Sequence, residues 1–216
     1  MTLLEYDLSS NNDLNFNGNS QVQPNDQGEP SKVLSPDKTK LAVISKNNNG
    51  ELIIYDLNNL TSKTVASNLW PKDVYYNNNY INSEVVWSPD GKQLAFNAGT
   101  NGGPQVYVIN TDGTNQRQIT TDSGTSKVSI DWSPDNKNLV YRTEQIHVFP
   151  SGGTGYEGNT AELKIFNLDS SKETQVVPAD DQSREALGLN HFYSSRITIS
   201  WRNNQELISF YSYHFE

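Results

Sequence analysis

Residues 86–96 read Val-Trp-Ser-Pro-Asp-Gly-Lys-Gln-Leu-Ala-Phe, and related segments recur along the chain. Two close copies span 33–43 and 131–141, and a degraded copy with Arg-Asn-Asn in place of Ser-Pro-Asp spans 200–210. An apolar run, Ser-Pro-Asp-Gly and a second apolar run are typical of two strands joined by a tight turn, because proline presets φ and glycine or asparagine accepts a positive φ. Each copy therefore predicts one β-hairpin.

A second pair of strands follows each of the first three hairpins. Each pair consists of an apolar run, a polar turn and a last strand, over 51–66, 105–120 and 162–177. The apolar runs are continuous rather than alternating, which indicates strands that are buried on both faces of their sheet. Four-stranded sheets stacked face to face around an axis satisfy this condition. The sequence thus predicts an all-β fold, a β-propeller of four-stranded antiparallel blades.

Four blades in one domain, residues 1–216, are expected from the repeats. The last blade should combine C-terminal with N-terminal strands, because Leu3–Leu8 resembles the third strand of a repeat and 20–24 resembles the fourth. Pairing Leu3–Leu8 with 207–213 would remove a free sheet edge, and free edges promote aggregation. A monomer is favoured, while a fragment of a larger ring or a dimer that exchanges half-blades stays open. The expected blades span about 31–67, 84–120, 128–178, and 196–216 together with 2–24.

The segments 87–96 and 105–120 resemble the Pro-Asp repeat of TolB-like β-propellers, which is also found in the propeller domains of prolyl-oligopeptidase-type peptidases. The resemblance covers essentially the whole chain in repeat form and departs from the pattern in the fourth copy. It implies a binding scaffold, because these repeats mostly mediate protein contacts or gate an attached enzyme. The sequence has no Gly-x-Ser-x-Gly elbow of a peptidase and no phosphate-binding glycine loop, so we expect no catalytic residues.

Charge and composition exclude several partners. The net charge is −9, with 25 acidic and 16 basic residues, which leaves no basic footprint for nucleic acid or anionic lipid. The absence of cysteine excludes disulfides and thiolate metal sites. No run of residues is long and apolar enough to cross a membrane, and the first residues do not resemble a signal peptide. We expect a soluble protein, cytoplasmic on this criterion, or periplasmic or extracellular if a leader was removed.

One end of the blades is expected to carry the binding site. In a four-stranded meander, the connections from second to third strand and from one blade to the next share this end, which we call the long-loop face. Its predicted connections span 67–83, 97–104, 145–161 and 179–195. Loops on rigid scaffolds often carry function, and aromatic residues suit stacking on a sugar or anchoring a protein. The alternative, that these aromatics pack the loops onto the blades, stays open. The predicted binding residues are Trp70, Tyr75, Tyr76, Tyr80, Tyr156, Phe192, Tyr193 and Arg196.

All three histidines, His147, His191 and His214, also fall on the long-loop face. The favoured hypothesis is a non-enzymatic module that binds a protein or carbohydrate ligand and needs no cofactor. As an alternative, three neutral imidazoles would hold Zn²⁺ or Mn²⁺. The protein would then be a metal-dependent enzyme acting on an acidic polysaccharide, as the resemblance to pectate-degrading lyases on Pro-Asp propellers implies. A third hypothesis is an assembly module that pairs half-blades between chains.

Overall fold

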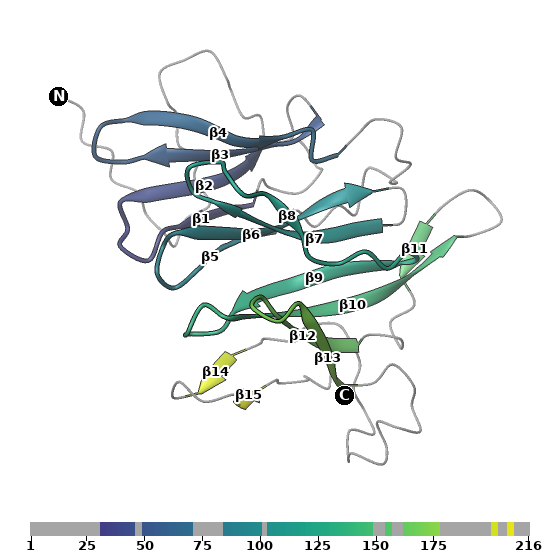
Figure 1. Ribbon diagram of the computed structural model, residues 1–216. Coiled ribbons are helices and arrows are strands. Elements are labelled where there is room, and N and C mark those ends of the chain that lie inside the picture. The colour runs from purple at the N-terminus through teal and green to yellow at the C-terminus, as the bar shows by residue number, and fades with distance from the viewer. Residues whose placement is uncertain are drawn as a thin grey trace, which may run out of the picture.

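The computed structural model describes residues 31–45, 49–70, 84–100, 103–148, 154–156, 162–177, 200–202 and 207–209. The strands in these ranges form three four-stranded antiparallel meanders and one smaller hairpin (Figure 1). This confirms the predicted all-β fold and its four-stranded unit. No helix in the described ranges is long and apolar enough to span a membrane.

In each of the three meanders, which we number in chain order, the four main strands pair in succession, and the third sheet has a fifth, short strand. Sheet 1 consists of β1 (Lys32–Leu34), β2 (Lys40–Ser45), β3 (Glu51–Asp56) and β4 (Thr61–Ser67). Sheet 2 consists of β5 (Val85–Trp87), β6 (Gln93–Thr100), β7 (Gly103–Asn110) and β8 (Arg117–Gln118). Sheet 3 consists of β9 (Thr125–Trp132), β10 (Asn138–Val148), β12 (Glu162–Asn167) and β13 (Lys172–Val177), and β11 (Thr154–Tyr156) pairs with the end of β10.

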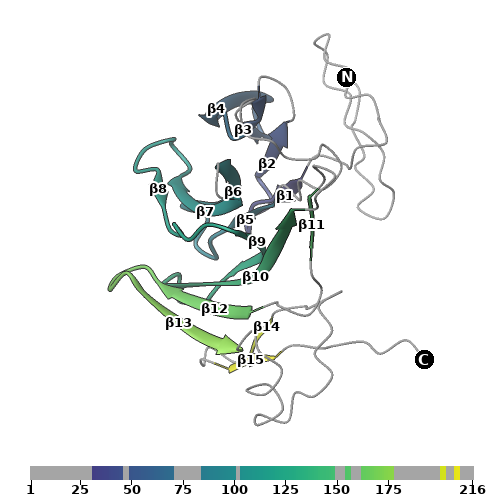
Figure 2. The ribbon, with the colours of Figure 1, turned by 90° about the vertical axis from the view of Figure 1, so that its right-hand side faces the viewer.

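The sheets stack face to face, and their first strands meet on the inner side (Figure 2). Strand β5 contacts both β1 and β9. Trp87, at the end of β5, donates a hydrogen bond from its indole Nε1 to the carbonyl oxygen of Val33 in β1, over 3.0 Å. Radially stacked sheets that share an inner side are the blades of a propeller.

Two apolar clusters fill the interfaces between the sheets, which we call seam 1–2 and seam 2–3. In seam 1–2, Ala42 and Ile44 of β2 belong to the same cluster as Leu94 and Phe96 of β6. Ala95, which lies between the latter two in sequence, belongs to the cluster of seam 2–3. Leu94, Ala95 and Phe96 are all 0% exposed. Sheet 2 is therefore covered on both faces, which explains why its strands are apolar at successive positions.

The Ser-Pro-Asp segments form the same turn in all three sheets. In sheet 2 the Ser88 hydroxyl donates to Asp90 over 2.7 Å and accepts the Gln93 N–H over 2.9 Å. Asp90 also accepts the Lys92 N–H over 3.1 Å. Gly91 has a φ of +69°. The aspartate of each segment therefore caps its own turn. The same three contacts recur in the turns at 35–40 and 133–138.

The turn of sheet 1 keeps the Asp37 carboxylate ionised in acid. Hydrogen bonds from the Ser35 hydroxyl and from the N–H and hydroxyl of Thr39 lower the pKa of Asp37 from 3.8 to about 2. Because the folded pKa lies below the unfolded one, Asp37 stabilises the fold above about pH 4, and this contribution disappears as the pH falls through 2. In thermal melts from about pH 5 downward, the melting temperature should fall more steeply with decreasing pH for the wild type than for Asp37→Asn. If the melting temperatures of the two proteins fell equally with pH, the lowered pKa of Asp37 would be contradicted.

Leu60 lies in the turn between β3 and β4 with a φ of +58°, a region that leucine rarely adopts. Its side chain is 68% exposed, so burial does not offset the backbone cost. We expect Leu60→Asn to raise the free energy of unfolding by about 1 kcal/mol, because asparagine tolerates this conformation better. Ser171→Leu, at the matching turn position of sheet 3 with a φ of +54°, should lower it by a similar amount. Urea denaturation measures both changes, and a less stable Leu60→Asn variant would refute this account.

The degraded fourth copy forms a hairpin with the register of the other three. Strand β14 (Ser200–Arg202) pairs with β15 (Leu207–Ser209). The hairpin lies on the side of sheet 3 away from sheet 2 (Figures 1 and 2). The first two strands of a fourth repeat therefore form without Ser-Pro-Asp. Partners seven residues apart recur in all four hairpins: Leu34 with Leu41, Trp87 with Leu94, Trp132 with Leu139, and Trp201 with Ile208.

The connection between β6 and β7 is shorter than the sequence suggested. The predicted long loop at 97–104 is wrong, because the two strands continue pairing up to Thr100 and Gly103. Gly103 has a φ of +111°, which only glycine adopts readily, and it lets the chain reverse at once. Gly99, Gly103 and Pro104 indicate a loop in the sequence, although all three belong to paired strands.

Closure of the ring concerns residues outside the described ranges. The expected partner strands in 2–24 lie there, and so does most of 196–216. The pairing of Leu3–Leu8 with 207–213, the single-domain boundary at 1–216 and the exchange of half-blades therefore stay predictions.

Candidate functional site

The structure describes part of the predicted binding surface. Trp70 is described with its side chain, and Tyr156 and His147 are described by their backbone in β11 and β10. The remaining predicted residues lie outside the described ranges, and their roles stay predictions. They are Tyr75, Tyr76, Tyr80, Phe192, Tyr193, Arg196, His191 and His214.

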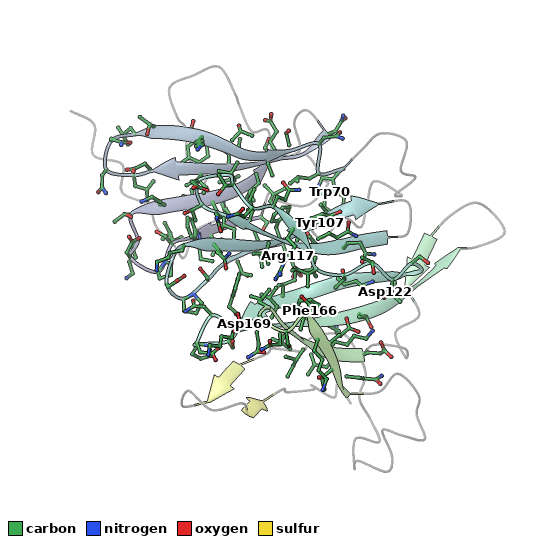
Figure 3. The ribbon with its side chains drawn as sticks, viewed as in Figure 1. Trp70, Tyr107, Arg117, Asp122, Phe166 and Asp169 are labelled. Carbon is green, nitrogen blue, oxygen red and sulfur yellow. The ribbon has the colours of Figure 1, made fainter. Side chains whose placement is uncertain are left out.

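Trp70 follows β4 at the long-loop face (Figure 3). Its N–H donates to the carbonyl oxygen of Asn49 over 2.6 Å, and the Leu69 N–H donates to that of Gly50 over 3.2 Å. The Trp70 ring lies so close to Gly50 that a Cβ there would be 2.5 Å from the ring Cδ1. Trp70 is partly buried against the cluster of seam 1–2. This geometry supports the alternative in which the aromatic residue packs its loop onto the blade.

Strands β10 and β11 form a hairpin that extends sheet 3 at the long-loop face. Pairing of β10 with β12 reaches Thr143 and pairing with β9 reaches Gln145, whereas 146–148 pair with β11. In this hairpin Tyr156 is the partner of Ile146, and His147 is the partner of Gly155. Two of the predicted residues, Tyr156 and His147, therefore occupy adjacent register positions of one hairpin.

A buried lysine fixes the connection from sheet 2 to sheet 3. The Lys127 side chain is 0% exposed, and its ammonium group forms an ion pair with the Asp122 carboxylate over 2.8 Å. The ammonium also donates to the Thr125 hydroxyl over 2.6 Å. On the other side of the loop, the Gln105 amide donates to the Asp122 carbonyl oxygen over 2.8 Å. The side chains of two sheets thus hold this loop in one position at the long-loop face (Figure 3).

The electrostatics of this loop keep the ion pair charged. Burial lowers the pKa of the Lys127 amine, and the contact with Asp122 opposes that shift. Burial raises the pKa of Asp122, but hydrogen bonds from Lys127 and Thr125 outweigh it, so that the pKa of the carboxyl stays below its ordinary value. Asp122 is therefore ionised at neutral pH. Because the Asp122 side chain is 43% exposed, its end of the ion pair reaches the surface at the long-loop face.

Two further side chains join the sheets on the inner side of seam 2–3. The Ile130 N–H donates to the Glu84 carboxylate over 3.0 Å. The Asn97 amide, which is fully buried, donates to the Lys127 carbonyl oxygen over 3.2 Å and accepts the Glu84 N–H over 2.7 Å. These contacts align the first strands of sheets 2 and 3 where the long-loop face begins.

Seam 2–3 also contains a network of charged side chains. The Tyr141 hydroxyl donates to the Glu173 carboxylate. The Lys164 ammonium contacts Glu173 over 3.1 Å and Glu162 over 3.3 Å, and its side chain is 15% exposed. Burial and the bond to Glu173 raise the pKa of Tyr141, so this residue acts as a hydrogen-bond donor. Paired in this way, the side chains form a structural network.

The matching positions of sheet 2 carry two aromatic rings instead. Phe96 and Tyr107 are strand partners there, as Tyr141 and Lys164 are in sheet 3. Their rings stack with centroids 5.7 Å apart and an interplanar angle of 20°. At these matching positions seam 1–2 is apolar, whereas seam 2–3 contains charged side chains. Sequence reasoning missed this difference, although comparing the repeats at these positions would have revealed it.

The metal hypothesis remains untested. Within the described ranges, no three His, Cys, Asp or Glu side chains lie close enough together to hold a metal ion. Of the three candidate ligands, His147 is described only by its backbone, and His191 and His214 lie outside these ranges. A histidine-bound Zn²⁺ or Mn²⁺ therefore stays a prediction.

One family model and several solved structures match this chain. The family model of the TolB beta propeller domain matches residues 15–151. The isopeptidase AtxE2 in its apo form superposes with a TM-score of 0.52 and 17% identity, over 75% of this chain and 30% of the isopeptidase. A protein from Agrobacterium tumefaciens assigned as TolB has a TM-score of 0.47 and 14% identity, over 69% of this chain and 49% of that protein. Dipeptidyl peptidase 4 from Porphyromonas gingivalis has a TM-score of 0.47 and 15% identity, over 75% of this chain and 27% of the peptidase. This chain spans about half the length of the Agrobacterium protein and less than a third of the two enzymes.

Proposed function

Because this chain belongs to the TolB β-propeller family, we propose that it is a binding module that recognises a protein or another extended ligand through its long-loop face. In this proposal the chain itself carries no catalysis. The blades serve as a rigid support, and the connections at one end of the sheets make the contacts.

The β10–β11 hairpin is the observation that carries this proposal. It extends sheet 3 beyond the ends of its neighbouring strands and contains Ile146, Val148 and Tyr156. A two-stranded hairpin alone is only marginally stable in water, so a partner that covers this one would stabilise it. Tyrosine combines a large apolar ring with a hydrogen-bonding hydroxyl, which suits it to a contact of this kind.

The opposite end of the sheets is less suited to binding. Each Ser-Pro-Asp turn there uses its own serine and aspartate to satisfy its own backbone. The turn between β3 and β4 does the same, because Asp56 accepts the N–H groups of Asn58 and Asn59. These turns offer few free groups to a ligand, which favours the long-loop face.

Single cysteines at the two ends of the sheets test the proposal. The natural chain has no cysteine, so a thiol-reactive polyethylene glycol reacts at one position only. Gly155→Cys places the label on the β10–β11 hairpin, and Gln116→Cys places it on an exposed residue near the β7–β8 turn. We expect the Gly155 label to reduce capture of a natural partner by at least roughly tenfold, and the Gln116 label to leave capture unchanged. Loss of capture with the Gln116 label alone would place the binding surface at the opposite end.

Light scattering of the unlabelled protein and of the protein labelled at Gly155→Cys distinguishes binding from assembly. A monomer is compatible with the binding module, whereas a stable dimer whose formation the Gly155 label does not affect would favour exchange of half-blades.

A further inference from the structure

The loop at 122–125 surrounds the Lys127 ammonium with four oxygen atoms. Two belong to Asp122, its carboxylate oxygen at 2.8 Å and its carbonyl oxygen at 3.2 Å. Two belong to Thr125, its hydroxyl at 2.6 Å and its carbonyl oxygen at 3.4 Å. The ammonium has no solvent contact, since the Lys127 side chain is 0% exposed.

Contacts that do not involve Lys127 also hold these oxygens in place. The Thr125 hydroxyl donates to the Asp122 carboxylate over 2.8 Å. The Gln105 amide donates to the Asp122 carbonyl oxygen, and Gln105 is itself 1% exposed and held by the Thr120 hydroxyl over 2.7 Å. Gly124, with a φ of +81°, allows the loop to turn back on itself. The loop is thus shaped by its own bonds as well as by the ion pair.

We propose that the 122–125 loop is a site for a monovalent cation, which Lys127 occupies with its own ammonium group. The four oxygens carry one negative charge in total, that of the Asp122 carboxylate, and one positive charge balances it. Three of the four oxygens lie 2.8–3.4 Å from the ammonium nitrogen, beyond the roughly 2.3–2.6 Å that Ca²⁺ requires, and the Thr125 hydroxyl at 2.6 Å lies at the upper limit of that range. All four distances exceed the roughly 2.0–2.1 Å of Mg²⁺. The loop therefore suits an ion of ammonium or potassium size. This inference is independent of the proposed function.

A covalently attached cation has a physical advantage over a free one. A free ion would have to be bound from solution, so the loop would depend on the ion concentration. The Lys127 ammonium is present at every salt concentration. The connection between sheets 2 and 3 therefore keeps its shape at the long-loop face whatever ions surround the protein.

Removing the tethered cation tests this proposal. Lys127→Ala empties the space of the ammonium and should lower the melting temperature. Ammonium or potassium chloride should then raise the melting temperature of the variant above its value in tetramethylammonium chloride at the same ionic strength. The gain should be about 4 °C when the cation reaches roughly ten times its dissociation constant, and the wild type should gain nothing. An equal gain in both proteins, or no selective gain in the variant, would overturn the proposal.

Two more variants complete the test. Lys127→Ala combined with Asp122→Asn removes the negative charge of the loop and should abolish the selective gain. Lys127→Met fills the space with an apolar chain and should fold without responding to ammonium. If Lys127→Ala does not fold in tetramethylammonium chloride, its refolding in ammonium chloride supports the proposal. Failure to refold in both salts, while Lys127→Met folds, overturns it.

Discussion

Replacing Phe96 by alanine should lower the free energy of unfolding by about 4 kcal/mol, within the range typical of fully buried aromatic side chains. The Phe96 side chain is 0% exposed, and its ring stacks on Tyr107 in seam 1–2. The substitution removes apolar burial and leaves a cavity between two sheets that cannot collapse freely, because their strands are paired on both sides. For a chain of this length, the change corresponds to a fall in melting temperature of roughly 8–16 °C.

Tyr107→Phe provides the matched control for this change. It keeps the stacked ring and removes only the hydroxyl, which donates to Gln118 over 3.1 Å. An exposed hydrogen bond of this kind contributes about 1 kcal/mol or less. Urea denaturation followed by tryptophan fluorescence measures both variants. If the two losses were equal, stacked aromatic rings would not be what holds seam 1–2 together.

Replacing Gly50 by alanine should cost about 3 kcal/mol, for two separate reasons. Gly50 has a φ of +90°, where a side chain is strained. The new Cβ would also lie 2.5 Å from Cδ1 of Trp70 and 3.1 Å from Cβ of Leu69, so the loop after β4 would have to move. We expect lower stability in urea and a shifted tryptophan emission, because the contact between Gly50 and Trp70 is lost.

A double-mutant cycle separates the two reasons. In the background of Trp70→Ala the steric conflict is largely absent, so Gly50→Ala should then cost only the backbone strain of about 1–2 kcal/mol. If Gly50→Ala has the same cost in both backgrounds, the ring does not restrict this position. A Gly50→Ala protein as stable as the wild type would contradict both parts of the argument.

The repeats made most of the fold predictable. Ser-Pro-Asp with glycine or asparagine fixes a turn through local hydrogen bonds, and continuous apolar strands indicate a sheet covered on both faces, as Ala95 and Phe96 of β6 now show. The family match confirms the resemblance to TolB-like propellers. The short connection at Gly103 was missed because glycine and proline mark loops and tight hairpins alike.

Much less of the candidate site could be predicted. The aromatic residues of the long-loop face stand out in the sequence, but whether a ring packs or stays exposed depends on neighbours that are distant in sequence, as Trp70 and Gly50 illustrate. Lys127 looks like an ordinary surface residue at the start of a strand. Its burial follows from the way the 122–125 loop curls around it, and local sequence patterns carry no such information.

Sheet 2 has an apolar interface on one side and a partly charged one on the other. In repeat architectures, stability is approximately the sum of the units and of the contacts between nearest neighbours, so the two interfaces respond to solvent separately. Dissolved salt screens ion pairs that reach the surface, such as that of Glu173, whereas sulfate and phosphate strengthen the burial of apolar groups. High concentrations of these salts should therefore stabilise seam 1–2 more than seam 2–3, which contains ion pairs beside its apolar cluster. Amide hydrogen exchange would then divide the molecule into a slowly exchanging pair of blades and a faster third one.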